Sequence, residues 1–189
     1  MAYLIRSCNI SAFQSLFEND PESISTIRYN IPITFKGNLS HNLTQYAVPL
    51  RNSGASISLE LTPLHLAIIC NSHEIVKCIL DSCMSKKIDK SVVQKVLTAK
   101  TKVVFKKKNA EEYPKDAYSL NGWNVLHLAS KFSSRCLKDL LYFAHEKEVI
   151  DSIQNMLDEK DANDLKSPLH VAASVPDKSA VRWVYVHCY

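Results

Sequence analysis

A tetrapeptide of the form Leu-His-(Leu or Val)-Ala occurs three times in this chain, with its histidine at His65, His127 and His170. In each copy a Thr, Asn or Ser stands three residues before the histidine. Such a residue can cap a helix, because its side-chain oxygen accepts a hydrogen bond from an N–H of the first turn. In two copies a proline follows the cap, where a helix needs no backbone donor. Each copy therefore predicts the start of a helix, and the recurrence predicts a repeated structural unit.

The first copy is the clearest and lies within Leu61 to Leu80, LTPLHLAIICNSHEIVKCIL. Apolar residues recur there at helical spacing on both sides of the polar break Asn71-Ser72-His73. The pattern predicts two short helices that form a helical hairpin. A single hairpin cannot bury both of its faces, so it predicts neighbours of the same kind. The residues that define the unit in the three copies are Thr62, Pro63, Leu64, His65, Leu126, His127, Ser167, Pro168, Leu169 and His170.

These copies resemble the ankyrin repeat, whose signature is T-P-L-H-x-A at a period of ~33 residues. The resemblance implies an all-α solenoid of helix-pair units, with extended fingers or hairpin insertions between them. It also implies that the motif histidines hydrogen-bond within their own repeat and to the backbone of the next one. The function that it implies is non-catalytic binding of a partner protein through the concave face and the fingers, as a scaffold, an adaptor or an inhibitor.

The copies are unevenly spaced, since His65 and His127 lie nearly two periods of ~33 residues apart. A repeat has decayed between them, or a long finger has been inserted. The predicted organisation is a degenerate N-terminal capping repeat at 1–29, a hairpin or irregular linker at 30–58, an ankyrin repeat at 59–84, a finger insertion or decayed repeat at 85–120, an ankyrin repeat at 121–147, a helical extension and finger at 148–164, and at 165–189 a last ankyrin repeat, truncated if the chain is a fragment.

Inside the 85–120 segment, apolar residues from Val92 to Leu97 predict a short helix after Asp89. Thr101 to Phe105 is rich in β-branched residues and predicts a strand. Within it, Lys102-Val103-Val104-Phe105 resembles the [RK]-V-x-F motif by which regulatory subunits dock on type-1 protein phosphatase. Two apolar residues two positions apart project from one face of a strand and can fill two pockets. The alternative function is therefore a phosphatase-targeting subunit, and the other interpretation is a strand packed on its own repeat.

The irregular spacing is also similar to that of IκB-like inhibitors of Rel/NF-κB factors, which have extended fingers between ankyrin repeats. Residues 153–172 carry this likeness, because a long segment there leads into the third motif copy. The D-S-G-x-x-S degron of that family is absent from the sequence.

The remaining composition argues against several other classes. The net charge of +4 is too small to indicate nucleic-acid binding, and no run of about 18 apolar residues predicts a membrane span. Three glycines cannot build a phosphate loop, and no carboxylate or thiolate recurs with the histidines to hold zinc. We expect no enzyme, cofactor or metal. The six cysteines form no C-x-x-C pair, and no apolar export signal is present, so we expect reduced thiols in a cytoplasmic or nuclear protein.

The last ten residues contain one charged side chain, that of Arg182. Helical spacing turns Ala180, Val181, Val184 and Tyr185 back onto the preceding repeat. The terminal unit of a solenoid needs a polar outer face, which this helix lacks. The sequence thus predicts either a fragment of a longer ankyrin protein or self-association through the C-terminal end.

Overall fold

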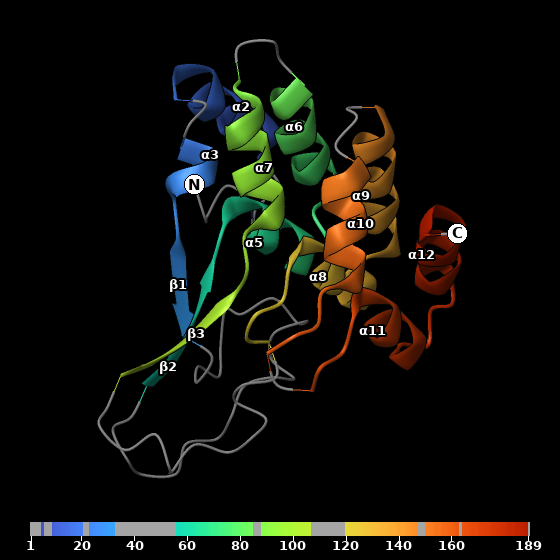
Figure 1. The fold of residues 1–189 in the computed structure, drawn as a ribbon. Helices are drawn as coiled ribbons and strands as arrows, with labels where there is room; N and C mark the ends of the chain where they lie inside the picture. Colours follow the sequence, from blue (N-terminus) through green and yellow to red (C-terminus); the bar gives the residue numbers. More distant parts are fainter. Residues whose placement is uncertain are drawn as a thin grey trace.

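The computed structural model describes residues 5, 9–20, 23–32, 56–84, 88–106, 120–146, 150–162 and 164–188. This part of the chain is mostly helical and includes one small sheet (Figure 1). Each copy of the histidine motif begins a helix pair. The pairs are α5 (Pro63–Ile69) with α6 (His73–Met84), α8 (Val125–Phe132) with α9 (Ser134–Glu146), and α11 (Pro168–Ser174) with α12 (Ser179–Cys188).

The three pairs lie side by side in chain order. The first helices form one row, in which α8 contacts α5 and α11, and the second helices form another, in which α9 contacts α6 and α12. Helix α2 (Ile10–Asn19) packs on α6 and extends the second row toward the N-terminus. The apolar stripe that the sequence places on each helix is buried between the rows, as with Leu64 and Ile79 in the first pair and Leu126 and Leu140 in the second.

A third row runs along one face of the stack (Figure 1). It consists of α3 (Ser23–Thr26), α7 (Lys90–Thr98) and α10 (Ile150–Asp158), and α7 contacts both of the others. Helix α7 begins where the sequence places a helix after Asp89, whose Oδ1 accepts from the Ser91 N–H at 2.6 Å. The sequence pattern places α7 in the predicted finger insertion or decayed repeat at 85–120, and α10 in the predicted helical extension at 148–164. In the structure each follows the second helix of a pair and lies in this third row.

The sheet is antiparallel in the order β1 (Tyr29–Pro32), β2 (Ser56–Leu61), β3 (Lys102–Lys106). Leu59 of β2 lies opposite Ile31 on one side and Val103 on the other. Leu59 and Val103 are buried, so one face of the sheet joins the core. The described residues are mostly helical, but this sheet corrects the prediction of an all-α fold. The alternating polar and apolar residues of β2 form a strand, although they lie in a segment that the sequence pattern assigns to a linker and to the start of a repeat. The predicted tips of the insertions, at 33–55 and 107–119, lie outside the described residues.

The turn between α5 and α6 replaces the expected glycine with Asn71, at φ 54°. The N–H of Asn71 donates to Ile68 and that of Ser72 donates to Ala67, both at 2.9 Å. This is the Schellman arrangement, in which a residue in the left-handed conformation ends a helix. Asn tolerates that conformation better than other side chains do, which explains how a glycine-poor chain keeps this tight turn.

Candidate protein-interaction surface

Each motif histidine closes the start of its own helix. In the first copy the Thr62 Oγ1 accepts from the His65 N–H, and the Thr62 N–H donates to the His65 Nδ1, both at 3.2 Å. This is a capping box in which His takes the place of Glu or Gln. The Asn124 N–H lies 3.3 Å from the Nδ1 of His127 in the second copy. In the second copy Nδ1 also lies 2.8 Å from the Asn124 Oδ1. We place the ring proton on Nε2 in both copies because Nε2 faces a backbone carbonyl oxygen, which can only accept, and this leaves Nδ1 as the accepting nitrogen.

That proton ties each of the first two units to the next one. The Nε2 of His65 donates to the carbonyl oxygen of Ala99 at 3.1 Å, and the Nε2 of His127 donates to that of Lys166 at 2.9 Å. Both rings are buried. Burial lowers the pKa of His65 to about 3, despite the opposing effect of the Ala99 carbonyl, and burial also lowers the pKa of His127. Both rings are therefore neutral at pH 7, and they act as bridges inside the stack.

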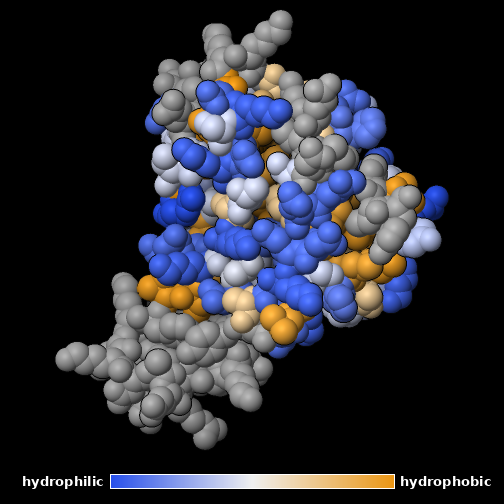
Figure 2. Space-filling view, viewed as in Figure 1, coloured by the Kyte–Doolittle hydropathy of each residue, from blue (hydrophilic) through white to orange (hydrophobic). Residues whose placement is uncertain are grey.

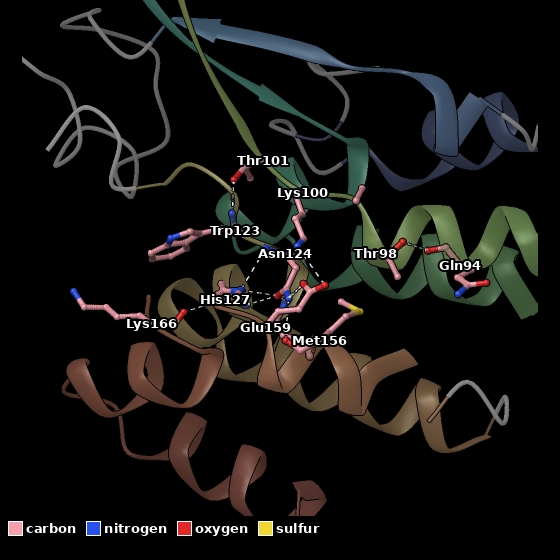
Figure 3. Close-up of polar contacts among 12 residues, drawn as sticks. Gln94, Thr98, Lys100, Thr101, Trp123, Asn124, His127, Met156, Glu159 and Lys166 are labelled. Atoms are coloured by element: carbon pink, nitrogen blue, oxygen red, sulfur yellow. Dashed lines mark hydrogen bonds and ion pairs between the residues drawn. The ribbon is translucent and has the colours of Figure 1, made fainter. Parts of the chain in front are cut away.

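The two ends of the segment between α7 and α8 are hydrogen-bonded to each other at Thr101 (Figure 3). The Thr101 N–H donates to the Trp123 carbonyl at 2.9 Å, and the Trp123 N–H donates to the Thr101 Oγ1 at 3.0 Å. The Gly122 N–H donates to the Thr101 carbonyl at 2.9 Å, and the Thr101 hydroxyl donates to the Leu120 carbonyl. The chain at Thr101 thus continues structurally at Trp123. This clip accounts for part of the long spacing from His65 to His127, because Thr101 and Trp123 are 22 residues apart in the chain and are hydrogen-bonded to each other.

Asn124 joins the third helix row to the start of α8 (Figure 3). Its Oδ1 caps the helix, accepting from the N–H groups of Leu126 and His127 at 3.0 and 3.1 Å. Its Nδ2 donates to the Met156 carbonyl and to the Glu159 Oε2, both at 2.9 Å. The other Glu159 oxygen lies 3.3 Å from the Lys100 Nζ. A Thr cap could not make the contacts to α10. The sequence pattern does not predict this network, and the change from Thr to Asn at the cap is the signal that could have suggested it.

The residues of the candidate phosphatase-docking motif lie in β3. Val103 is buried opposite Leu59, and its N–H donates to the Asn121 Oδ1 at 3.0 Å. Lys102 is exposed and Val104 is partly buried, whereas the side chain of Phe105 lies outside the described residues. For Val103 to enter a pocket of another protein, β3 would have to separate from β2 and from Asn121. The geometry matches the alternative in which the strand packs on its own repeat.

The part of the chain that the structure describes contains no group of three or more His, Cys, Asp or Glu side chains that could hold a metal ion. Cys70, Cys78, Cys83 and Cys136 form no disulfide, and Cys78, Cys83 and Cys136 are buried. Burial raises the pKa of Cys83 to about 12 and that of Cys136 to about 11. Such thiols stay protonated and are poor nucleophiles and ligands. None of the described helices has the length and apolar character that a membrane span requires.

The first-helix row and the strands define one side of the molecule, which we call the inner face. We define this face by the exposed or partly exposed residues of these elements, namely Lys102 of β3, Lys131 of α8, Lys166 just before α11, and Ala173 and Ser174 of α11. The third helix row covers another side, and Figure 2 shows a mostly hydrophilic surface over α7 and α10. The residues directly before α5, α8 and α11 and the first helices themselves contribute to the inner face. Stacked repeats present an extended surface of this kind to their ligands.

Comparison with known proteins supports the assignment of the clearest unit. Residues 60–87 match the sequence model of a family described as Ankyrin repeat. The match includes the end of β2 and all of α5 and α6. No curated protein and no solved structure gives a match. The chain therefore carries an ankyrin repeat, at residues 60–87, where the sequence pattern placed its best copy.

Proposed function

We propose that this chain is a non-catalytic protein-binding module built as a short ankyrin-type solenoid, with the three helix pairs as its successive units. The observation that supports the proposal most is the repeated bridge from a motif histidine to the following unit, made by His65 to Ala99 and by His127 to Lys166. The same bridge in two consecutive units is what a stack of equivalent repeats requires. The repeated histidine bridge is consistent with the ankyrin-repeat match at residues 60–87.

The proposed binding surface is the inner face. Rigid first helices hold its side chains in place, since α5 and α8 are buried over most of their length. Lys131 and Ser174 occupy the same position in the second and third units, at the seventh residue after the N-cap. A partner that lies along the row would therefore touch successive units at equivalent points. The roles that fit are those of a scaffold, an adaptor or an IκB-like inhibitor, and they differ in how many partners are held at once.

The proposal includes a cytoplasmic or nuclear location and no nucleic-acid or membrane partner. The buried free thiols Cys78, Cys83 and Cys136 support a reducing compartment.

Affinity purification with quantitative mass spectrometry tests the proposed surface. The bait is compared with an inner-face variant, Lys131→Glu with Ala173→Glu, and with a control, Lys95→Glu with Gln154→Glu, on α7 and α10. Lys95, Ala173 and Gln154 are exposed and Lys131 is partly exposed, so all these variants should fold. We expect a partner that the wild type and the control retain and the inner-face variant loses. If every captured protein binds the two variants equally, the inner face is not the binding surface.

A further inference from the structure

In each of the first two helix pairs, one side is covered by the next pair. Among the described residues, the corresponding side of the third pair is not covered. His65 and His127 are buried and bonded to the next unit, whereas His170 is exposed and its Nε2 has no partner in the described part of the chain. Its Nδ1 accepts from the Ser167 N–H at 3.4 Å, as in the other copies, and also lies 2.7 Å from the Ser167 Oγ. The ring is therefore held in the same orientation, and it faces the side on which another unit would lie.

The second helix of each pair shows the same contrast. Tyr185 follows the buried Val184, as Leu141 follows Leu140 and Leu80 follows Ile79. Leu80 and Leu141 are 3% and 1% exposed, but Tyr185 is 62% exposed. Leu169 and Val181 are only partly buried, while the residues at their positions in the earlier pairs are fully buried.

Leu165 completes this surface and changes its shape. It lies two residues before the N-cap Ser167, as Gly122 lies two residues before Asn124, and both have positive φ, 54° and 78°. A Cβ on Gly122 would lie 3.0 Å from the Cβ of Ala162, in the loop that leads into the next unit. At the corresponding place Leu165 carries a full side chain that is 64% exposed. A further unit stacked in the same way would collide with it.

We propose that the end face formed by Leu165, Leu169, His170, Val181 and Tyr185 is covered by a second copy of this chain, related to the first by a two-fold axis. In the first two units the equivalent face packs against the next helix pair, so this face is chemically suited to bind the helix pair of another copy. A two-fold arrangement also avoids head-to-tail stacking, which Leu165 blocks. None of the five end-face residues is Lys, Arg, Asp or Glu, and Arg182 is the one such residue on α12, so two such faces can meet without opposed clusters of like charge. A two-fold contact is self-complementary, so one apolar patch supplies both halves.

Analytical ultracentrifugation over a range of protein concentrations tests this proposal on the full chain. We expect the wild type to form dimers and the variant Leu165→Asn with Tyr185→Glu to weaken the dimer at least tenfold. Both positions are exposed, and Asn tolerates positive φ, so the variant should keep its helical circular dichroism. Tyr142→Glu is the matched control, because Tyr142 is equally exposed at 63% but lies on α9 of the second helix pair and not among the residues of the end face. It should leave the dimer unchanged.

Hydrogen exchange supplies a second readout. The amides of α12 should become more protected as the concentration of the wild type rises, and those of the end-face variant should not. A wild type that stays monomeric at every concentration would overturn the proposal, as would a dimer that Tyr142→Glu dissociates as strongly as the end-face variant does.

Discussion

The Nε2 of His127 lies 2.9 Å from the carbonyl oxygen of Lys166, across the junction between two successive helix pairs. The same ring accepts from the N–H of Asn124 through Nδ1, so one buried side chain satisfies two backbone groups in different units. His127→Ala should lower the free energy of unfolding by about 1–3 kcal/mol, because it leaves those groups unpaired. Urea denaturation measures the change. His170→Ala is the control and should cost less than half as much, since its Nε2 bridges no second unit among the described residues.

The pH dependence of stability should carry the signature of His65. Its pKa is about 3 in the folded protein and about 6.5 in the unfolded chain, so the unfolded chain binds more protons between these values. This contribution is fully present above pH 6.5 and is lost as the pH falls, with a limiting slope of about 1.4 kcal/mol per pH unit. Urea midpoints at pH 7, 6, 5 and 4 should fall more steeply for the wild type than for His65→Gln. Parallel curves would show that His65 is not the titrating group, since carboxylates contribute equally to both proteins.

Asn124→Thr separates the two tasks of this side chain. The hydroxyl can still cap α8, but the Nδ2 contacts with Met156 and Glu159 are lost. We expect a loss of about 1–2 kcal/mol, because a buried carbonyl loses its donor. A double-mutant cycle with Glu159→Ala would measure the coupling, and Ser167→Thr should be close to neutral. If Asn124→Thr is also neutral, the contacts with α10 contribute little to stability.

Gly122 and Leu165 form a reciprocal pair for a test of backbone strain. Gly122→Ala places a Cβ 3.0 Å from Ala162 at φ 78°, and it should destabilise the protein by about 1–2 kcal/mol. Leu165→Gly relieves the left-handed strain at little loss of burial, and the extra flexibility of glycine offsets part of this gain. The net stabilisation should be about 0.5 kcal/mol. Thermal unfolding of dilute protein gives both values, and the prediction fails if the two substitutions shift Tm in the same direction.

Val103 tests the two interpretations of the segment from Lys102 to Phe105. If the strand packs on its own repeat, Val103→Ala should cost about 1–2 kcal/mol through lost burial, and Lys102→Ala should cost almost nothing. The phosphatase hypothesis predicts instead that type-1 phosphatase co-purifies with the wild type and is lost in the Val103→Ala, Phe105→Ala double variant. Helicity, measured by circular dichroism, shows whether the double variant has kept its fold.

The sequence alone was sufficient for features that depend on neighbouring residues. The starts of α5, α8 and α11 are set by a cap and a histidine three residues apart, so the pattern at Thr62, Asn124 and Ser167 predicts them directly. The cap at Asp89 before α7 and the β-branched run in β3 are equally local signals. The ankyrin resemblance rests on the same short-range pattern, and the match at residues 60–87 confirms it for the first copy.

The tertiary structure decided what depends on residues far apart in the chain. The central place of β2 requires one partner strand about thirty residues before it in the chain and another about forty-five residues after it. The clip at Thr101 and the second set of bonds made by Asn124 likewise join segments that no local pattern connects. Leu165 has an ordinary sequence context, and only the structure reveals its positive φ and its correspondence to Gly122. Caps and periodicity fix where helices begin because they act within one turn, whereas sheet pairing, helix rows and exposed faces arise from long-range packing.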